Sequence, residues 1–394
     1  MTRPHRSPPR SPCCGGVTTD WERSQPEGVR IEAASGVSGA DTSRTSRARG
    51  ADGCPGFGGA AVLEHDLLAT SSTWAGDEPI GDRVRAVGTA GFAGLSLTVD
   101  DLHEVRATIG FAALRRLLDG AGIVWVQLGP LDRWWAAPDR STDDEADAGV
   151  VFEATAALRA WQVVVRADTS VTGGSPAGMV DDWLRLADRT EQLGAQLVLE
   201  AEPWSNLSTV ERASRFVSTA GHPNSGLLVD AMHALRGGST LASIAGGVTP
   251  ATLAAVELSD GLLHTPSGMT LQEESRWARH LPGSGAWDLP GFVRVVRDLG
   301  FDEPWGVEVR TPAHRAMPTA DALRIAAAAT RAVLDAADAY DAPAAPAMPS
   351  TPAPTSAVDY EPVSEPRPVR PATPSLDLPA RPTRRRDADT GTPA

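Results

Sequence analysis

Four short apolar runs in the second half of the chain each end in a carboxylate. The runs are Leu197–Glu200, Leu227–Asp230, Leu253–Glu257 and Trp305–Glu308. Continuous apolar runs are typical of parallel strands, which are buried on both faces of their sheet. In an α/β barrel, the carboxyl ends of such strands line one mouth. Four acids placed there repel one another unless a cation or shared protons neutralise them. The pattern therefore predicts an oxygen-rich site for a divalent metal ion.

The rest of the central segment alternates apolar runs with segments of helical character. The expected strands cover residues 66–70, 92–97, 123–128, 161–166, 196–200, 226–230, 253–258 and 305–308. The expected helices cover residues 79–90, 111–118, 150–160, 180–193, a segment opened by a capping box at 208–211, 288–299 and 320–334. Eight strands alternating with helices predict an α/β fold, the (β/α)8 TIM barrel.

The two ends of the chain differ in composition from its centre. Residues 1–60 are rich in Arg, Ser, Gly and Pro, and residues 341–394 carry 13 of the 32 prolines. Such segments bury too little apolar surface to offset the entropy lost on ordering, so we predict two disordered tails. The barrel is then expected over residues 61–340, a length that suits one TIM barrel of about 250 residues.

Charge and lysine usage exclude several classes of protein. The chain has a net charge of −14, and the tails hold nearly equal numbers of Arg and acids, so the excess of acids lies in the barrel segment. Nucleic-acid binding is not expected, because it requires Lys and Arg at the phosphates. All 36 basic residues are arginine. Schiff-base, pyridoxal-phosphate and P-loop enzymes, which all need a lysine, are therefore excluded.

Cysteine and hydropathy patterns suggest where the protein works. The cysteines, Cys13, Cys14 and Cys54, lie in the N-terminal tail, so no disulfide or thiolate ligand is expected in the barrel. No apolar stretch approaches the roughly 18 residues of a membrane span, and the N-terminus has no apolar signal region. We expect a cytoplasmic protein that does not associate with membranes.

The segment 61–338 resembles the xylose isomerase-like TIM barrels of the sugar phosphate isomerase/epimerase family. The matching pieces are LVLEAEPWS at 197–205, GLLVDAMH at 226–233, VELSDG at 256–261, RHLPGSG at 279–285 and WGVEV at 305–309. No single piece is diagnostic. Their order, and their placement on successive strand ends, carry the resemblance.

In that family, residues from strands five to eight hold one divalent cation. The resemblance implies that Glu200, Asp230, Glu257 and Glu308 are the metal ligands of this chain. Glu257 is a departure, because the commoner pattern has His there. A set made only of carboxylates favours Mg²⁺ or Mn²⁺ over Zn²⁺.

The chemistry implied by the resemblance is proton transfer next to a carbonyl. The metal polarises the carbonyl of an α-hydroxy ketone or aldehyde and stabilises the enediolate. Glu200 and Glu308 would flank the reacting carbon, one as base while the other returns the proton. His233 and Arg279 would contact substrate oxygens, and His233 is grouped with the catalytic residues. A second departure is Ser284, which stands where the family usually has an acid.

Each of these residues also has a structural interpretation. Glu200 and Glu308 could be buried acids paired with their neighbours Arg166 and Arg310. Glu257 could likewise form a salt bridge rather than bind a metal. The convergence of four acids favours the site over a set of separate ion pairs.

Three other residues near these positions also have two interpretations. Arg279 could be an ordinary surface arginine. Glu202 and Asp260, which follow candidate ligands by two and three residues, are expected to be supporting or loop acids.

The predicted function is a metal-dependent isomerase or epimerase of a small sugar, sugar acid or cyclic polyol. One alternative is a dehydratase of an inosose-like or dehydroshikimate-like ketone on the same scaffold. Another is a non-catalytic barrel that has lost its metal. An apurinic endonuclease would need a His-rich cluster and a basic face, which the core lacks. The sequence leaves the substrate and the oligomeric state open.

Overall fold

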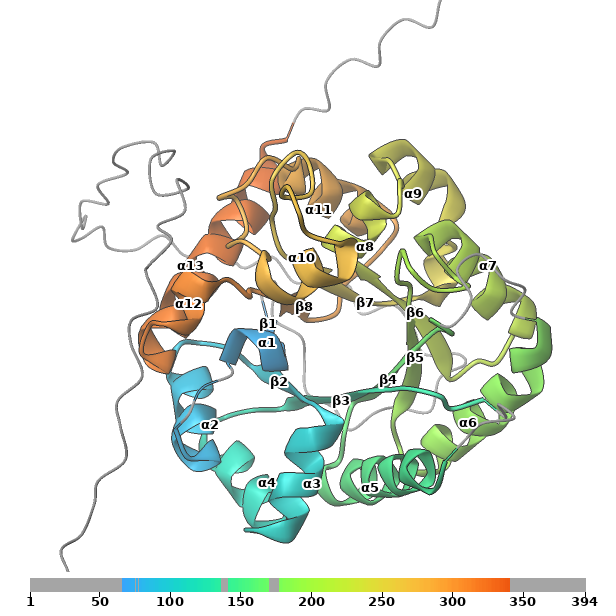
Figure 1. The fold of residues 1–394 in the computed structure, drawn as a ribbon, viewed down its shortest axis with the longest axis vertical. Helices are drawn as coiled ribbons and strands as arrows, with labels where there is room; N and C mark the ends of the chain where they lie inside the picture. The colour runs from blue at the N-terminus through green and yellow to red at the C-terminus, as the bar shows by residue number, and fades with distance from the viewer. Residues whose placement is uncertain (1–65, 75, 77, 136–140, 170–176, 341–394) are drawn as a thin grey trace, which may run out of the picture. The chain divides into compact units, whose positions relative to one another are not determined.

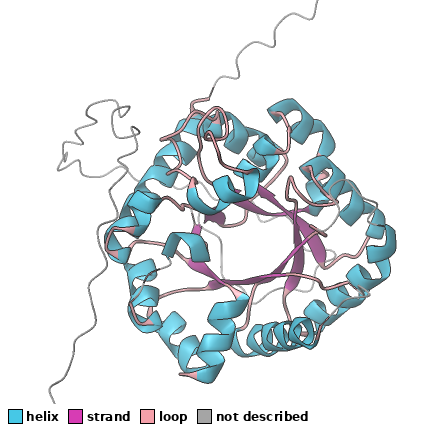
Figure 2. Ribbon diagram, viewed as in Figure 1, coloured by secondary structure: helices cyan, strands magenta, loops and turns pink. Residues whose placement is uncertain are grey.

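A closed barrel of eight parallel strands forms the centre of the molecule. The computed structural model describes residues 66–74, 76, 78–135, 141–169 and 177–340. Within these ranges the strands follow one another in sequential order around the barrel, and helices surround them (Figures 1 and 2). The predicted (β/α)8 fold is confirmed. The two tails predicted to be disordered, and the three cysteines, lie outside the described residues.

The strands are short, and each is followed by at least one helix. The strands are β1 (Leu67–Ala69), β2 (Gly94–Leu97), β3 (Trp125–Leu131), β4 (Gln162–Arg166), β5 (Gln196–Glu200), β6 (Ser225–Asp230), β7 (Leu253–Leu258) and β8 (Trp305–Val307). The helices are α1 (Ser71–Trp74), α2 (Ile80–Thr89), α3 (Val99–Ala107), α4 (Phe111–Gly120), α5 (Thr142–Leu158), α6 (Val180–Gln192), α7 (Val210–Ala220), α8 (Ala231–Arg236), α9 (Leu241–Gly247), α10 (Leu271–Trp277), α11 (Leu289–Asp298), α12 (Pro312–Arg315) and α13 (Thr319–Asp338).

The third strand is longer than the sequence predicts. We expected it to end at Leu128, because the following Gly129-Pro130 pair interrupts the apolar run. The strand instead continues to Leu131, and its register with β4 shifts between Leu128 and Leu131. Proline cannot donate to a ladder and is usually placed at strand edges or bulges. The irregular register accommodates it here.

The start of α5 also differs from the expectation. The sequence predicted a helix from residue 150, but α5 begins at Thr142. Ser141 accepts a hydrogen bond from the Asp144 N–H, and the Asp144 carboxylate accepts one from the Ser141 N–H. This reciprocal capping box starts the helix two turns earlier. The sequence did not predict this start, because the first two turns of α5 are acidic and contain few apolar residues.

The capping box predicted at residues 208–211 is wrong. Thr209 is the N-cap of α7, and its hydroxyl accepts from the Arg212 N–H at 3.2 Å. The Glu211 carboxylate instead accepts hydrogen bonds from the hydroxyls of Ser239 and Ser243, at 2.9 and 2.6 Å. Hydroxyl groups from a distant part of the chain thus bind the Glu211 carboxylate, which the local sequence pattern had assigned to the N-terminus of its own helix.

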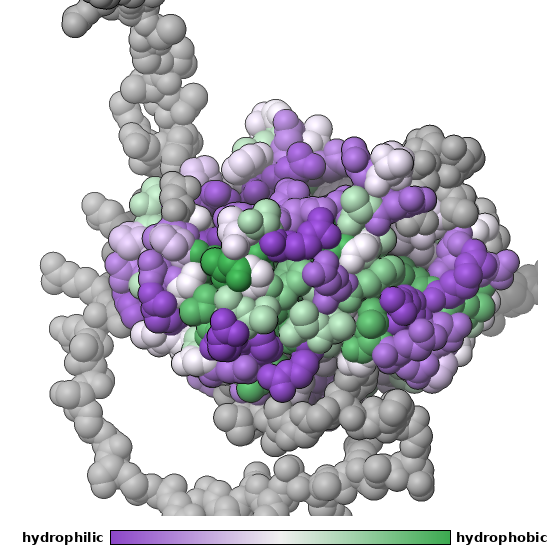
Figure 3. All heavy atoms as spheres, turned by 90° about the horizontal axis from the view of Figure 1, so that it is seen from below, coloured by the Kyte–Doolittle hydropathy of each residue, from purple (hydrophilic) through white to green (hydrophobic). Residues whose placement is uncertain are grey.

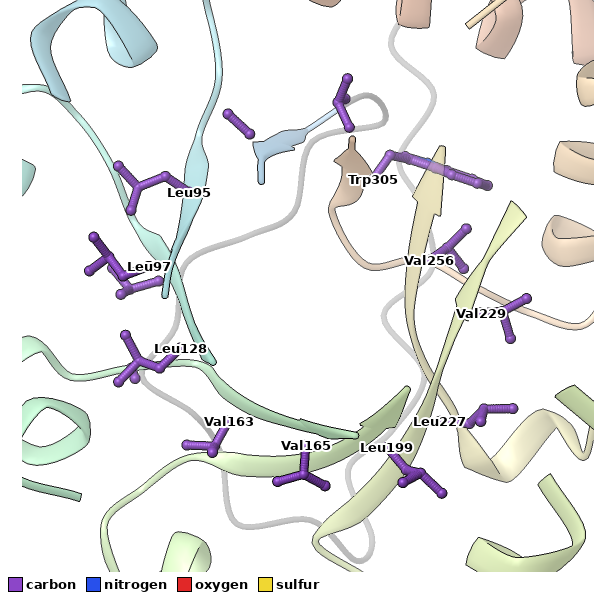
Figure 4. Close-up of a cluster of buried hydrophobic side chains, with 14 of the residues drawn as sticks. Leu95, Leu97, Leu128, Val163, Val165, Leu199, Leu227, Val229, Val256 and Trp305 are labelled. Carbon is purple, nitrogen blue, oxygen red and sulfur yellow. The ribbon is translucent and has the colours of Figure 1, made fainter. Parts of the chain in front are cut away.

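The main hydrophobic core lies between the strands and the helices. Figure 4 shows strand side chains such as Leu199, Val229 and Val256 pointing outward from the ring of strands. The alternate residues of these strands, which include Val164, Val198, Leu228 and Ala255, point inward and fill the barrel; Ala254 joins them where the register of β6 with β7 shifts. This alternation follows from the two-residue repeat of a strand. It fixes which residues at the strand ends face the mouth.

Three glutamines form a polar layer inside the barrel. Gln127 donates to Gln162 at 3.1 Å, and Gln162 donates to Gln196 at 3.1 Å and to the Ala254 carbonyl at 2.9 Å. Buried amides of this kind are tolerated because their hydrogen bonds are made. Gln127 also lines the cavity described below.

The outer surface mixes hydrophilic and apolar residues, as Figure 3 shows for the side of the barrel seen from below. In the described ranges, no helix combines the length and the apolar character needed to cross a membrane.

Candidate active site

The predicted acids lie at the carboxyl ends of neighbouring strands. Glu200 ends β5, Asp230 ends β6, Glu257 is the penultimate residue of β7, and Glu308 directly follows β8. Each of the first two is separated by two residues from an inward-pointing core residue, so its side chain also points inward. Asp230 pairs in register with Glu257, whereas Glu200 pairs with Leu228, two residues earlier on β6. Because the strands are staggered around the barrel, Glu200 does not lie at the same level as the Asp230–Glu257 pair.

Three of the four acids form a tight group. Asp230, Glu257 and Glu308 each offer one carboxylate oxygen, and these oxygens all lie within 4.8 Å of one another. Glu200 is not in this group. It lines the same cavity as Glu257 and Glu308, which has a volume of about 410 Å³. Asp230 is fully buried behind that cavity.

Arg279 lies among these acids rather than on the surface. Its side chain is 1% exposed. Nη1 donates to Asp230 Oδ2 at 2.8 Å, and Nη2 lies 3.2 Å from Glu308 Oε2. Nε donates to the Ser275 carbonyl at 3.0 Å. The surface interpretation of Arg279 is therefore excluded, and one guanidinium supplies positive charge to two of the predicted ligands.

The loop after β7 places Arg279. The backbones of Arg279 and Arg310 form an antiparallel bridge, with N–H to carbonyl distances of 3.2 and 2.9 Å. Asp260 holds the Pro-Gly-Ser-Gly loop, because its carboxylate accepts the Gly283 N–H at 3.0 Å. A Cβ at Gly285 would lie 2.2 Å from Asp260 Oδ1, so this approach requires glycine. Asp260 is thus a loop acid, as expected.

His233 connects the acidic group to Glu200. Its backbone N–H donates to Asp230 Oδ1 at 2.7 Å, which caps α8. Its ring Nδ1 lies 3.2 Å from Glu200 Oε1 but is not aligned for a hydrogen bond. Nε2 lies 3.0 Å from Arg279 Nη2. Burial acts to lower the pKa of His233, but the charges of Asp230 and Glu200 raise it overall.

The site is short of positive charge. Burial, followed by the charge of Glu308, raises the pKa of Glu257 well above its usual value. Burial also raises the pKa of Glu308, against the opposing charge of Arg279. Burial acts in the same direction on Asp230, but the charges of Arg279 and His233 and the hydrogen bonds from both residues together outweigh it and lower the pKa of this carboxyl. Arg279 therefore stabilises Asp230 as an anion, whereas Glu257 forms no ion pair within the described residues.

Glu202 has a larger place in the site than the sequence predicted. It is 2% exposed, and burial together with the nearby Glu200 raises its pKa to about 7. Oε1 lies 3.7 Å from Arg166 Nη1, while Oε2 is buried without a hydrogen-bond partner in the described residues. Arg166 also donates to Asp132 at 2.8 Å. Arg166 therefore pairs with Asp132 and Glu202, and the alternative interpretation, in which Arg166 pairs with Glu200, is not observed. The sequence signal for Glu202 was its position two residues after Glu200, as the second acid of the Leu-Glu-Ala-Glu segment.

The pairing of Glu308 with Arg310 is not observed either. Glu308 accepts instead from the Ser72 hydroxyl at 3.1 Å, in addition to its contact with Arg279. Arg310 lies over the ring of Trp277, with its guanidinium carbon 5.2 Å from the ring centroid. Sequence reasoning missed Ser72, because a serine after a short first strand carries no distinguishing pattern.

The donor set fits a divalent cation. Carboxylate oxygens are the ligands that Mg²⁺ and Mn²⁺ prefer, and three of them already lie close together. Buried negative charge exceeds the charge that Arg279 supplies, as the raised pKa of Glu257 indicates. A divalent ion would correct this imbalance.

Comparisons with known proteins agree with the fold. Residues 84–332 match the family described as xylose isomerase-like TIM barrel. The 3-dehydroshikimate dehydratase of Pseudomonas aeruginosa is 28% identical over 241 residues, which cover 60% of this chain and 37% of that protein. The inosose isomerase of Bacillus subtilis is 27% identical over 149 residues, which cover 37% of this chain and 51% of that protein. The matches thus span between about a third and a half of these relatives.

Solved structures show the same architecture. An IolI protein with a bound zinc atom superimposes with a TM-score of 0.61 at 19% identity, over 70% of this chain and 99% of that one. At this identity the likeness concerns the fold alone. The family match covers more than half of the chain and includes the strands that carry the acidic site. This chain therefore belongs to the xylose isomerase-like TIM barrel family.

Proposed function

We propose that the protein is a metal-dependent isomerase or epimerase of a small sugar, sugar acid or cyclic polyol. The observation that carries the proposal is the cluster of carboxylates at one cavity, where Arg279 pairs with Asp230 and Glu308 but not with Glu257. A structural cluster would pair each acid with its own cation or keep it at the surface. An acidic cavity with one cation too few suits a site that binds a divalent ion.

The residues of the site have distinct roles in this proposal. Asp230, Glu257 and Glu308 hold the cation, and Glu200 is the fourth ligand predicted from the sequence. Bound Mg²⁺ or Mn²⁺ would polarise the substrate carbonyl and offset the negative charge that develops on an enediolate. The remaining chemistry is the transfer of one proton.

Glu200 and Glu308 are the two groups assigned to that transfer. One removes the proton from the carbon beside the carbonyl, and the other returns a proton. Return to the opposite face of the same carbon gives an epimer, and return to the neighbouring carbon gives an isomer. His233 and Arg279 are assigned to binding substrate oxygens, since both border the cavity. His233 Nδ1 has no hydrogen-bond partner among the described residues, whereas Arg279 would exchange a contact with Glu308 or Ser275 to bind substrate.

Solvent exchange tests this proposal directly. The full chain with Mn²⁺ or Mg²⁺ is incubated in D₂O with a panel of ketoses and inososes, and deuterium at carbon is followed by proton NMR. We expect exchange with at least one compound, reduced by at least about a hundredfold in Glu308→Gln. Glu303→Gln, which removes a carboxylate that does not line the cavity, is the matched control and should exchange normally. Absence of exchange across the panel with metal-loaded protein would contradict the proposal.

A dehydratase is the second candidate, and one observation favours it. The alignment with the 3-dehydroshikimate dehydratase covers 60% of this chain, compared with 37% for the inosose isomerase. A dehydratase would use the same proton abstraction and then expel a β-hydroxyl. The same NMR experiment separates the two reactions, because dehydration removes a hydroxyl-bearing carbon signal and creates an alkene or aromatic signal.

The non-catalytic alternative predicts a third result. A barrel that has lost its metal would bind no divalent ion at the carboxylates and exchange no protons. Arg279 would then be the permanent cation of the cluster. Metal content and exchange measured on the same preparation distinguish this case from an enzyme tested with the wrong substrate.

A further inference from the structure

Two arginines at one side of the cavity have no carboxylate partner. Arg276 and Arg310 both line the cavity, and within the described part of the chain neither forms an ion pair. The other two arginines of the lining differ in this respect. Arg166 pairs with Asp132 and Glu202, and Arg279 pairs with Asp230 and Glu308. In a chain with a net charge of −14, unpaired arginines in an acidic cavity need an explanation.

Arg310 is held in place by its neighbours. Its backbone is bridged to that of Arg279, and its guanidinium lies over Trp277 at 5.2 Å. Nη1 lies 3.5 Å from the Ser72 hydroxyl oxygen. Nε is buried and has no acceptor among the described residues. A preorganised guanidinium with an unused donor is a binding group rather than a solvated surface charge.

Several arginines lie close to Arg310. Burial and the charge of Arg315 lower the pKa of Arg310, the charge of Glu308 raises it, and the charges of Arg276 and Arg279 lower it further. The acids of the metal group lie beyond Ser72, whose hydroxyl already donates to Glu308 at 3.1 Å. An anion between Arg276 and Arg310 would offset the repulsion among the arginines and accept a hydrogen bond from Arg310.

We propose that Arg276 and Arg310 form a subsite for an oxyanion group of the substrate, a carboxylate or a phosphate, with Ser72 positioning Arg310. The substrate is then an acidic polyhydroxylated compound rather than a neutral sugar or polyol. This inference rests on the proposed function, because it assigns the substrate class of the same cavity. Ser72 contacts both Glu308 and Arg310, so the anionic group lies within a few bonds of the reacting carbon.

Binding of a matched set of compounds tests the subsite. Glucose, glucuronate and glucose 6-phosphate differ at one carbon, and calorimetry or ligand-observed NMR gives their affinities for the full chain. The measurement is made without added divalent metal, which excludes chelation of the ion by the acids. We expect at least one acidic compound to bind ten times more tightly than glucose. The stronger of the two identifies the anion as a carboxylate or a phosphate.

Two variants localise the effect. Arg310→Gln should remove the preference for the acidic compound, and Arg310→Lys should retain part of it. Arg294→Gln removes the same charge from an exposed residue that does not line the cavity, and its affinities should stay within twofold of wild type. Near-ultraviolet circular dichroism verifies that each variant is folded.

Two results would overturn the inference. One is acidic compounds that bind no better than glucose, and the other is a preference for acids that survives in Arg310→Gln. Neither result depends on turnover. Proton exchange with neutral compounds would leave the isomerase proposal standing without this subsite, whereas anion binding without any exchange would leave the subsite standing alone.

Discussion

At the residue scale, one buried guanidinium lies among several buried carboxylates. Arg279 neutralises Asp230 well, but it cannot neutralise Glu257 and Glu308 as fully, and their pKa values rise. A buried ion pair of this kind adds little net stability, yet removing one partner is costly. The pairing therefore compensates the buried charge of Asp230 in the absence of metal and leaves negative charge on the other acids for a cation.

The first prediction concerns Arg279→Met. Without metal, this variant should lose about 3–5 kcal/mol of unfolding free energy, because Asp230 is left as an uncompensated buried charge. Mn²⁺ should restore part of the loss by supplying the missing positive charge. Urea unfolding in EDTA and in Mn²⁺ measures both effects. Arg294→Met removes an exposed pair with Asp298 and should cost less than about 1 kcal/mol. Equal stability of Arg279→Met and wild type in EDTA would contradict the account.

Glu303 provides a second prediction, on pH dependence. Burial, followed by the charge of Asp302, raises the pKa of Glu303 from 4.5 to about 7. The folded protein thus keeps a proton that the unfolded chain releases. The stability from this group is fully present below pH 4.5 and is lost as the pH rises towards 7.

Glu303→Gln should remove that loss, because glutamine keeps the neutral form at every pH. The variant should match wild type at pH 4 and exceed it at pH 8 by about 1 kcal/mol, less than the full shift implies because Glu303 is partly exposed. Denaturant unfolding at the two pH values tests this. A variant that is less stable than wild type at pH 8 would show that the carboxylate makes a favourable contact.

The sequence predicted which acids face the mouth, but not their cations. The two-residue repeat of a strand places Glu200 and Asp230 inward once the strand is recognised. The direction of Arg279 could not be predicted, since it depends on a bridge to Arg310 and on a loop held by Asp260. Contacts between segments far apart in the chain leave no local pattern.

At the element scale, the glycine of β8 makes room for the side chain of β7. Gly306 pairs in register with Glu257. A Cβ at Gly306 would lie 2.6 Å from Glu257 Cγ and 2.8 Å from the Val256 carbonyl oxygen. The short eighth strand therefore determines where the Glu257 carboxylate can lie.

A third prediction follows from this contact. Gly306→Ala should lose about 1–3 kcal/mol of unfolding free energy through overpacking, and its affinity for divalent metal should fall because Glu257 is displaced. Gly149→Ala, in the middle of α5 with nothing within 4 Å of its Cβ, should gain roughly 0.5–1 kcal/mol. Unfolding and metal titration of both variants measure these effects. Unchanged metal affinity in Gly306→Ala would show that Glu257 is not a metal ligand.

The order and type of the main elements were predictable because each strand is a continuous apolar run. The boundaries were less so. A capping box extended α5 towards the N-terminus, and β3 passed through a Gly-Pro pair that usually ends a strand. Short helices such as α1, α8 and α12 were missed, because four to six residues are too few to show a periodic pattern.

At the scale of the whole molecule, fold and charge agree with a small-molecule enzyme. The barrel brings residues from β2, β3, β4, β5 and β7, and from the segments that follow β1, β8 and α10, to one polar cavity. The net charge of −14 is unfavourable for binding nucleic-acid phosphates. The cytoplasmic location stays a prediction from the sequence, as does the choice of Mg²⁺ or Mn²⁺.

The central claim is that acids from successive strands hold a divalent cation, and a Mn²⁺ titration of the full chain tests it most directly. Wild type should bind one ion per chain, as measured by equilibrium dialysis. The double variant Asp230→Asn, Glu257→Gln should bind at least about tenfold more weakly. Glu191→Gln is the control, because it alters a separate exposed group of Asp188, Glu191 and His222. Wild type that binds no ion, or a double variant that binds as tightly as wild type, would contradict the account.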